Sequence, residues 1–437
     1  MQKKRYAIVG TGGRALGMFA RPLVQDFPET AELVALCDPN PRRMAAMAAE
    51  LGDAEPVHYT DFGEMLRQAD PDAIVVATRD CHHAEYVIAA LRAGKRVFSE
   101  KPLCTTARQC RDILAAAAES DGLCLVTHNA RYSAAVARAR ELIGGGRLGH
   151  VTNMQYHETL DRCHGADYFR RWHRVKANSG GLLVHKASHH FDVLNFFAGA
   201  NPAVRAAPAG SAVERPEWVS ATGSLRFYGA NGPFRGPRCS RCEHADRCDF
   251  HVDLARKDAY RKLYFEAEGE DGYFRDGCVF DESIDIEDQM YVLLRYGSGL
   301  EVSYTLTAYC PYESERIVVE GTEGRLEYVQ TKSTGWAMGS QHLPGIETIA
   351  SESLKLYRPD EGIEEISLER VEGGHGGADP QLRRDFFGRD WCETPNEQMA
   401  SVEEAAQAVL VGAAANESIA TGRPVAVQEL LKPEGAA

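Results

Sequence analysis

The stretch RYAIVGTGGRALGMF, residues 5–19, constrains the fold more than any other part of the chain. An apolar run that suits a buried strand leads directly into the spacing G-x-G-x-x-A and then into a helical pattern. In such a unit the first glycine permits a tight turn, the second lets the backbone approach a pyrophosphate, and a small third residue allows close helix–strand packing. The helix N-terminus adds N–H groups and a positive dipole end. We therefore predict a dinucleotide-binding turn made of Gly10, Gly12, Gly13, Arg14 and Ala15.

A second apolar stretch, AELVALCDPN, ends in Asp38. An acidic residue at the end of the second strand accepts hydrogen bonds from both hydroxyls of an adenosine ribose, and its charge repels a 2′-phosphate. This favours NAD over NADP. Arg42 and Arg43, which follow closely, keep NADP open as the alternative.

Strand and helix patterns continue to alternate through DAIVVAT, CHHAEYVIAALRAG, RVFSEKP, ARQCRDILAAAAESDG and LCLVTHN. Such alternation predicts a doubly wound parallel sheet, in which ligands gather at the carboxyl ends of the strands. The residues expected at those ends, and so near a cofactor, are Thr78, Arg79, His83, Glu100, Lys101 and Asn129.

The E-K-P sequence at residues 100–102 follows the fifth predicted strand. Pro102 fixes a turn that would present Lys101 to a nicotinamide ring. A plain turn at the end of a strand is the alternative, and the position of E-K-P in the sheet favours the functional interpretation.

The stretch GLLVHKASHHFD, residues 181–192, is rich in ionisable groups. If it is helical, His185 and His189 share one face and His190 points elsewhere. A metal site, an acid–base site and an ordinary amphipathic helix all remain open from spacing alone.

The preceding segment HGADYFRRWHRVKANSGG, residues 164–181, mixes aromatic rings with arginines. Aromatic faces suit the C–H groups of a sugar, and guanidinium groups bind hydroxyls or an anionic substituent. We therefore expect a carbohydrate substrate, with an acidic sugar as one option. The expected substrate-binding residues are Arg131, Tyr168, Arg171, Trp172, Lys186 and His189, with His375 and Asp379 of a later glycine-rich loop as further candidates.

Four of the 12 cysteines have a spacing typical of metal ligands. Cys239, Cys242 and Cys248 form C-x2-C-x5-C, and Cys278 follows within an insert of about residues 231–280. We predict a structural zinc ion, or an iron–sulfur cluster as the less favoured alternative, held by these four thiolates. His251 competes with Cys278 as the fourth ligand, and unconnected surface cysteines remain a third option.

Composition limits the class of protein. A chain of 437 residues with 44% hydrophobic residues is expected to form two domains. The net charge of −14 and the absence of a Lys/Arg-rich tract argue against nucleic-acid and membrane partners. The N-terminal apolar run is too short for a signal sequence, so we expect a cytoplasmic protein that binds a small molecule.

Several of these motifs together resemble the glucose–fructose oxidoreductase/inositol dehydrogenase (Gfo/Idh/MocA) family. They are the G-x-G-x-x-A turn, E-K-P at 100–102, G-G at 180–181 followed by His189 and Asp192, GTEGRLE at 321–327 and TGRPV near the end. The resemblance implies a Rossmann domain with a doubly wound parallel sheet over residues 1–128. It also implies an α/β domain with an open, mainly antiparallel sheet over residues 129–437, and a homo-oligomer, dimer or tetramer.

The same resemblance implies that Lys101 is the active-site lysine and that His189 matches the histidine of the family pattern G-G-x-x-x-D-x-G-x-H-x-x-D. The chain departs from this pattern, because His185 replaces the aspartate and Lys186-Ala187 replaces a small or apolar residue followed by glycine. His185 is therefore a third candidate catalytic residue, and a nearby ammonium would lower its pKa.

Two enzyme classes fit this site. The first is an NAD-dependent oxidoreductase that transfers a hydride from or to a hydroxyl-bearing carbon of a sugar, sugar acid or cyclitol. The second, which the resemblance implies because the reaction is known among relatives of that family, is an NAD-dependent glycosidase that works by transient oxidation at C3, elimination, water addition and re-reduction. A non-enzymatic NAD sensor is a third, less favoured class, because the predicted site contains many ionisable groups.

Overall fold

The computed structural model describes residues 3–205, 214–332, 343, 345–369, 372–374, 376–389 and 396–432. The chain divides into two compact units, each built from three segments. Unit 1 consists of Met1–Tyr132, Asp253–Arg275 and Glu372–Ala406, and unit 2 consists of Ser133–Val252, Asp276–Val371 and Gln407–Ala437. Segments distant in sequence therefore complete each unit.

Unit 1 is built on a sheet that, in the described residues, has seven strands in the order β15-β6-β5-β4-β1-β2-β3. Its strands are β1 (Lys4–Val9), β2 (Ala31–Cys37), β3 (Val57–Tyr59), β4 (Ala73–Val76), β5 (Arg96–Ser99), β6 (Cys124–Val126) and β15 (Ala400–Ser401). All neighbouring pairs are parallel except β15 with β6. The order 3-2-1-4-5-6 is that of a dinucleotide-binding fold, so the predicted doubly wound parallel sheet is confirmed.

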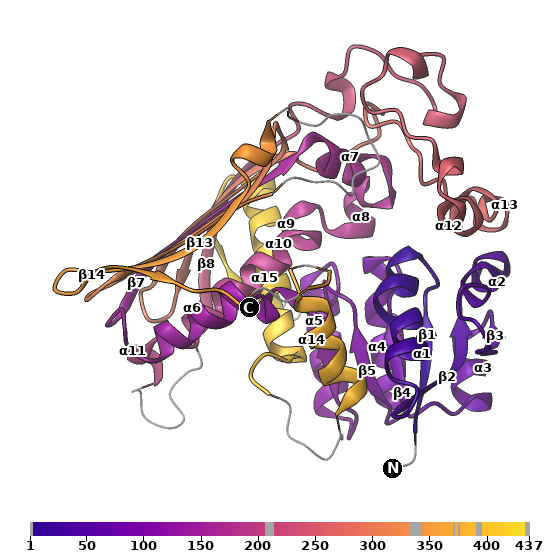
Figure 1. The fold of residues 1–437 in the computed structure, drawn as a ribbon, viewed down its shortest axis with the longest axis horizontal. Coiled ribbons are helices and arrows are strands. Elements are labelled where there is room, and N and C mark those ends of the chain that lie inside the picture. The colour runs from indigo at the N-terminus through magenta and orange to yellow at the C-terminus, as the bar shows by residue number, and fades with distance from the viewer. Residues whose placement is uncertain are drawn as a thin grey trace. The chain divides into compact units, whose positions relative to one another are not determined.

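Helices connect these strands (Figure 1). They are η1 (Ala15–Ala20), α1 (Arg21–Asp26), α2 (Pro41–Ala48), α3 (Phe62–Gln68), η2 (Asp80–His82), α4 (His83–Arg92), α5 (Ala107–Ala118) and η3 (Asn129–Tyr132). Three helices begin at a side chain that caps a free backbone N–H: Asn40 for α2, Asp61 for α3 and Thr106 for α5. Capping residues in the sequence thus set where these helices start.

The other two segments of unit 1 pack on this sheet. The later segment forms α14 (Ala378–Arg383) and η11 (Arg384–Gly388), and the Tyr6 hydroxyl donates to the Phe386 carbonyl at 3.0 Å. The Phe98 and Phe386 rings stack with centroids 4.5 Å apart. The middle segment, residues 253–275, forms η8 (Leu254–Arg256), α12 (Asp258–Tyr260), η9 (Arg261–Phe265) and α13 (Glu268–Asp271). It adds the buried side chains Leu263 and Tyr264 to the core of unit 1.

Unit 2 is built on a second sheet, whose nine described strands run in the order β14-β13-β12-β11-β7-β10-β9-β8-β16. They are β7 (Val151–Asp161), β8 (Pro216–Ser224), β9 (Gln289–Tyr296), β10 (Glu301–Cys310), β11 (Glu313–Gly321), β12 (Arg325–Lys332), β13 (Ser351–Arg358), β14 (Gly362–Ile366) and β16 (Val425–Ala426). Only β7 and β10 pair in parallel among these strands. The prediction of an open, mainly antiparallel sheet is confirmed.

Helices of unit 2 cover one face of this sheet; Figure 1 shows α6 and α10 on that side. The first helices are α6 (Ala134–Gly144), α7 (Arg162–Arg170), η4 (Trp172–Arg174), α8 (Lys176–Ser179), α9 (Leu182–His185), α10 (Ala187–Ala198) and α11 (Pro202–Arg205). Short turns η5 (Gly229–Asn231), η6 (Cys239–Arg241), η7 (Ala245–Arg247), η10 (Ile346–Thr348) and η12 (Val427–Leu431) follow. The long helix α15 (Val402–Thr421) begins in unit 1 and continues in unit 2.

The stretch expected to form one helix over residues 181–192 is interrupted. Gly180 and Gly181 both have positive φ, at 69° and 73°. The helix that follows ends at His185 and a new one begins at Ala187, so Lys186 separates His185 from His189. Within the described ranges, no helix is long and apolar enough to cross a membrane.

Candidate active site

The glycine turn of unit 1 has the geometry expected for a pyrophosphate-binding loop. Gly10 has φ +86°, and a Cβ atom there would lie 2.6 Å from the Ala77 carbonyl oxygen, so only glycine fits. The Gly13 N–H points out of the loop and donates to the Tyr264 hydroxyl at 2.6 Å. Ala15 is buried and begins η1. The loop therefore offers an amide to an acceptor oxygen, as phosphate binding requires.

Asp38 lies buried at the end of β2. One carboxylate oxygen accepts from the Thr11 N–H at 2.8 Å and from the Thr11 hydroxyl at 2.9 Å. The other accepts from the Asn40 N–H at 2.9 Å. Asp38 thus joins the loop after β2 to the glycine turn, a structural role that the sequence did not reveal. Its carboxylate still has lone pairs that can accept hydrogen bonds from a ribose.

Glu100 anchors the E-K-P turn at the end of β5. Its carboxylate contacts the Arg14 Nε at 2.6 Å and accepts from the Lys101 N–H at 3.0 Å. Burial alone would raise the pKa of Glu100, but the charges of Arg14 and Lys101 outweigh burial and lower it. Glu100 thus fixes the backbone of Lys101, whose side chain is half-buried.

Three more of the predicted residues at this edge have partners inside unit 1. The His83 ring is buried between the carbonyl oxygens of Pro102, at 2.7 Å, and Thr78, at 3.3 Å. The Arg79 guanidinium lies over the Tyr273 ring, 5.1 Å from its centroid. His83 therefore connects the ends of β4 and β5.

A second polar group at this edge involves Asp379, which the sequence had indicated as a substrate-cleft candidate. The Asn129 amide donates to Asp379 at 2.7 Å, and Arg14 lies 3.9 Å from the same carboxylate. Arg131 is fully buried and contacts Glu404 at 3.1 Å. Unit 1 thus brings Arg14, Glu100 and Asp379 together, whereas His375 lies outside the described residues.

Unit 2 gathers rings from α7, η4 and α9, which we call the ring cluster: Tyr168, Trp172, His173 and His185. The His173 and His185 rings lie 4.2 Å apart, and Tyr168 lies 5.4 Å from His185. Trp172 stacks on His173 at 3.6 Å. Arg171, another predicted substrate residue, contacts Asp167 at 2.8 Å.

A buried pair that the sequence did not indicate supports the ring cluster. His164 contacts Glu313 at 2.7 Å through Nδ1 and the Tyr168 hydroxyl at 3.0 Å through Nε2. Glu313 begins β11, 149 residues away in the chain, so no local pattern could have linked the two. Burial raises the pKa of Tyr168 to about 12, which keeps its hydroxyl protonated near neutral pH.

Lys186 and His190 both face Glu158 of β7. The Lys186 ammonium lies 3.1 Å from this buried carboxylate, and burial raises the pKa of Glu158. Burial would lower the pKa of Lys186, but the charge of Glu158 outweighs burial and raises it. His190 is buried and its Nδ1 lies 2.8 Å from the Tyr304 hydroxyl, whereas His189 is half-buried. His189 is thus the more accessible member of the histidine pair.

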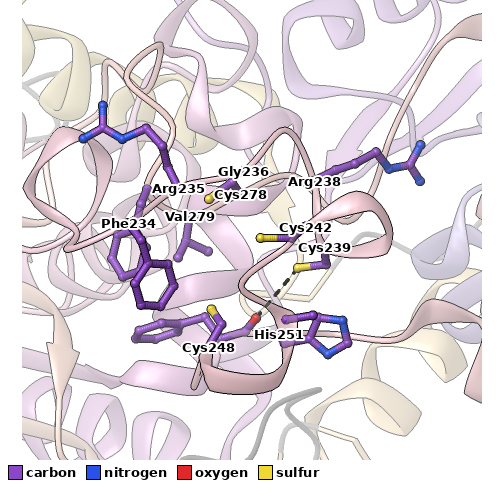
Figure 2. Close-up of a pocket in the computed structure, with 13 residues that line it drawn as sticks. Phe234, Arg235, Gly236, Arg238, Cys239, Cys242, Cys248, His251, Cys278 and Val279 are labelled. Carbon is purple, nitrogen blue, oxygen red and sulfur yellow. Dashed lines mark hydrogen bonds between the residues drawn. The ribbon is translucent and has the colours of Figure 1, made fainter.

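The four predicted metal ligands line one pocket in unit 2. Figure 2 shows the sulfur atoms of Cys239, Cys242, Cys248 and Cys278 around a common space, with His251 to one side. Gly236 makes room for this arrangement, since a Cβ atom there would lie 2.6 Å from the Cys242 sulfur.

Hydrogen bonds hold the two ends of the cysteine segment together. The Cys239 N–H donates to the Asp276 carbonyl at 2.8 Å, and Arg238 contacts the Asp276 carboxylate at 2.7 Å. In the described part of the chain, however, no group of three or more His, Cys, Asp or Glu residues has the arrangement of a metal site. The predicted metal therefore has no direct support from the geometry.

Both parts of the chain match known domains. Residues 4–128 match the NAD-binding Rossmann fold of the Gfo/Idh/MocA oxidoreductase family, and residues 140–427 match its C-terminal alpha/beta domain. The oxidoreductase YteT of Bacillus subtilis is 32% identical over 448 residues, which cover 98% of this chain and 99% of that protein. The inositol 2-dehydrogenase of Rhizobium meliloti is 28% identical over 185 residues, 42% of this chain and 53% of that protein.

Solved structures share the fold. An oxidoreductase domain protein from Kribbella flavida aligns with a TM-score of 0.67 at 20% identity, over 98% of this chain and 100% of that one. An oxidoreductase from Agrobacterium radiobacter, solved with NAD+, L-tartaric acid and magnesium, aligns with a TM-score of 0.65 at 15% identity, over 98% and 100%. With both domains matched, the chain belongs to the Gfo/Idh/MocA family of NAD-binding oxidoreductases.

Proposed function

We propose that this protein is an NAD-dependent oxidoreductase that transfers a hydride at a hydroxyl-bearing carbon of a sugar, sugar acid or cyclitol. The observation that carries the proposal is the half-buried Lys101, whose backbone N–H is held by Glu100 at the carboxyl edge of a parallel sheet. That edge is where ligands bind in such sheets. When bound, NAD supplies the hydride acceptor, and the protein supplies binding, orientation and proton transfer.

Lys101 exchanges a proton with the substrate hydroxyl oxygen in this proposal. Glu100 restrains the turn and keeps its negative charge near the Lys101 ammonium. Arg14 pairs with the Glu100 carboxylate through Nε. Gly10, Gly12 and Gly13 receive the pyrophosphate. Residues at the ends of β4 and β6 (Thr78, Arg79, His83 and Asn129) shape the cofactor site.

The ring cluster binds the sugar in this proposal. Tyr168 and Trp172 offer faces to C–H groups, and His185 and His189 donate to or accept from hydroxyls. Lys186 is already paired with Glu158, so it contributes a hydrogen-bond donor whose charge is largely balanced. Arg131 and Arg171, which also have carboxylate partners, take supporting positions.

A redox-neutral glycosidase is the second candidate. The buried His164–Glu313 pair and Tyr168 add proton-carrying groups beyond those a simple alcohol oxidation requires. A 2,7-anhydro-N-acetylneuraminate hydratase from Mediterraneibacter gnavus is 29% identical over 204 residues, 46% of this chain and 51% of that protein. In this alternative, oxidation at C3 acidifies the C2 proton, its removal expels the aglycone from C1, water adds, and the hydride returns to C3.

One incubation separates these two candidates. Purified protein with NAD and a panel of sugars, cyclitols, sugar acids and aryl glycosides is followed both at about 340 nm, where NADH absorbs, and by aglycone release. The proposal expects NADH that depends on a sugar or cyclitol. Aglycone release without net NADH would replace it with the glycosidase, and no reaction with any member would contradict both.

We also propose that Cys239, Cys242, Cys248 and Cys278 bind a structural metal ion, with zinc preferred over an iron–sulfur cluster. Support comes from the four sulfur atoms around one pocket and from the pairing of Arg238 with Asp276 at its margin. Ligation would require the thiolates to move closer together, since the present arrangement is not that of a metal site. Four protein ligands leave no position for substrate, so the role is structural.

Elemental analysis tests this assignment. We expect about one zinc per chain. Cys242→Ser should lose this zinc and, with it, the order of the insert of residues 231–280. Its activity should fall only as an indirect consequence. Absorbance near about 400 nm would indicate an iron–sulfur cluster instead. Protein that contains neither metal, with four freely reacting thiols in the folded state, would refute the metal site.

Finally, we propose that the protein works as a homo-oligomer, a dimer or tetramer, in the cytoplasm. The side chains of Tyr291 and Leu293 on β9 are 51% and 55% exposed. These apolar groups on the second sheet suit an interface between copies. Light scattering of the purified protein should give twice or four times the 48.1 kDa of the chain, and a monomer at all concentrations would contradict the proposal.

A further inference from the structure

The segment of residues 253–275, which we call the arm, leaves unit 2 and joins unit 1. It packs on the part of unit 1 where the sequence predicts the adenosine half of the cofactor. The Asn40 amide donates to the Ala267 carbonyl at 2.9 Å, and the Arg43 Nε donates to the Leu263 carbonyl at 3.1 Å. Figure 1 shows α12 and α13 next to α2. The arm is thus a built part of unit 1, fixed by its backbone carbonyls.

The arm also brings two carboxylates to the two arginines that follow Asp38. Arg42 contacts Glu270 at 2.7 Å, and Arg43 contacts Asp271 at 2.7 Å. Arg43 also lies 3.6 Å from Asp38. Burial would raise the pKa of Asp271, but the hydrogen bond and charge of Arg43 outweigh burial and lower it. Both arginines therefore already have a carboxylate partner in the same chain.

The two pairs differ in how well they are shielded from solvent. The Arg43 and Asp271 side chains are 9% and 16% exposed, whereas those of Arg42 and Glu270 are 67% and 36% exposed. Exposed pairs contribute little, because water and salt screen them. Asp271 is therefore the stronger partner and Glu270 the weaker one.

These pairs matter because an arginine at this position is the usual partner of the NADP 2′-phosphate. That phosphate would have to break both arm pairs and would then lie among the carboxylates of Asp38, Glu270 and Asp271. The 2′-hydroxyl of NAD needs neither arginine. We propose that the arm sets the cofactor preference of this enzyme, with Asp271 and to a lesser degree Glu270 occupying the arginines that would otherwise accept NADP. The inference rests on the proposed function, because it assumes that a nicotinamide dinucleotide binds to the glycine turn.

Calorimetric titration with NAD+ and with NADP+ tests the proposal on the full chain. Asp271→Asn should lower the Kd for NADP+ by about tenfold, because Arg43 loses its closer carboxylate and keeps only Asp38 at 3.6 Å, and should change the Kd for NAD+ by less than about threefold. Glu270→Gln should lower the Kd for NADP+ by only about two- to threefold. Asp271→Glu, which keeps the charge, should preserve the preference for NAD+.

Asp258→Asn is the matched control. It removes the same charge from the arm, but Asp258 is exposed and pairs with Arg261 and Lys262 instead of with α2. The ratio of the two Kd values should stay that of the wild type. Because Glu270 lies at the surface, Glu270→Gln keeps the test available if Asp271→Asn does not fold.

Three results would overturn the proposal: an unchanged Kd for NADP+ in Asp271→Asn, an equal gain for both dinucleotides, or the same gain in Asp258→Asn. An equal gain would mean that the arm blocks the site in general. These outcomes are separate from failure of the proposed function. NAD+ that binds but reacts with no sugar contradicts that function alone, whereas normal sugar oxidation with an unaltered NAD+/NADP+ ratio contradicts the arm's role alone.

Discussion

The buried His164–Glu313 pair should make part of unit 2 sensitive to acid. The two side chains are 11% and 7% exposed and lie 2.7 Å apart. Burial alone would raise the pKa of Glu313, but the charge and hydrogen bond of His164 outweigh burial and lower it to about 2. A carboxyl with a lowered folded-state pKa stabilises the fold above its unfolded pKa and loses that contribution as the pH falls through the folded value.

The magnitude follows from the same values. A fall of the pKa from 4.5 to about 2 corresponds to about 3 kcal/mol at 1.36 kcal/mol per pKa unit. The contribution should be complete above pH 4.5 and lost between about pH 4.5 and pH 2, with about 2 kcal/mol gone by pH 3. Glu313→Gln cannot titrate, so the gap between wild type and variant should shrink from about 3 kcal/mol at pH 7 to about 1 kcal/mol at pH 3.

Hydrogen exchange of peptides from α7 and β11 measures this gap, because a chain of two units need not unfold in one step. Wild type and variant are compared at the same pH, so that the intrinsic exchange rate cancels. Glu301→Gln, at the exposed first residue of β10, is the matched control and should show no gap at either pH. A gap of equal size at pH 7 and pH 3 would refute the ionic account and leave only a loss of packing.

Two further variants address the cofactor turn. Asp38→Ala should weaken NAD binding by about 1.5–3 kcal/mol in calorimetry, because both a ribose partner and the contacts to Thr11 are lost. Unchanged affinity would show that Asp38 is not part of the cofactor site. Tyr264→Phe should tighten NAD binding about two- to tenfold, because it removes the hydroxyl that competes with a phosphate oxygen for the Gly13 N–H. Weaker binding would instead indicate that the Tyr264 hydroxyl binds the cofactor.

Local signals predicted the parallel sheet of unit 1 well. The strand, Gly10 and the helix of the first turn follow one another directly, so their geometry depends on neighbouring residues only. The same holds for Asp38 at the end of β2 and for the E-K-P turn after β5. Parallel order then places the ends of these strands at one edge.

Contacts between distant segments account for what the sequence did not predict. The helix over residues 181–192 is interrupted at Lys186, whose ammonium pairs with Glu158 of β7, and helical periodicity contains no information about such a partner. Tyr264 reaches Gly13 across 251 residues, although its own segment reads as a polar insert. Asp271 and Arg43 are 228 residues apart, so the contact between the arm and α2 could not be predicted from the sequence either.

The catalytic role of Lys101 is the central claim, and the turnover of Lys101→Ala tests it most directly. Lys95→Ala is the matched control, because it removes the same charge just before β5, where Lys95 pairs with the exposed Asp70. We expect Lys101→Ala to bind NAD with near-normal affinity but to lose about 10²–10⁴-fold in kcat on the sugar or cyclitol identified above, whereas Lys95→Ala keeps its kcat. Normal turnover in Lys101→Ala would contradict the account and make the E-K-P turn purely structural.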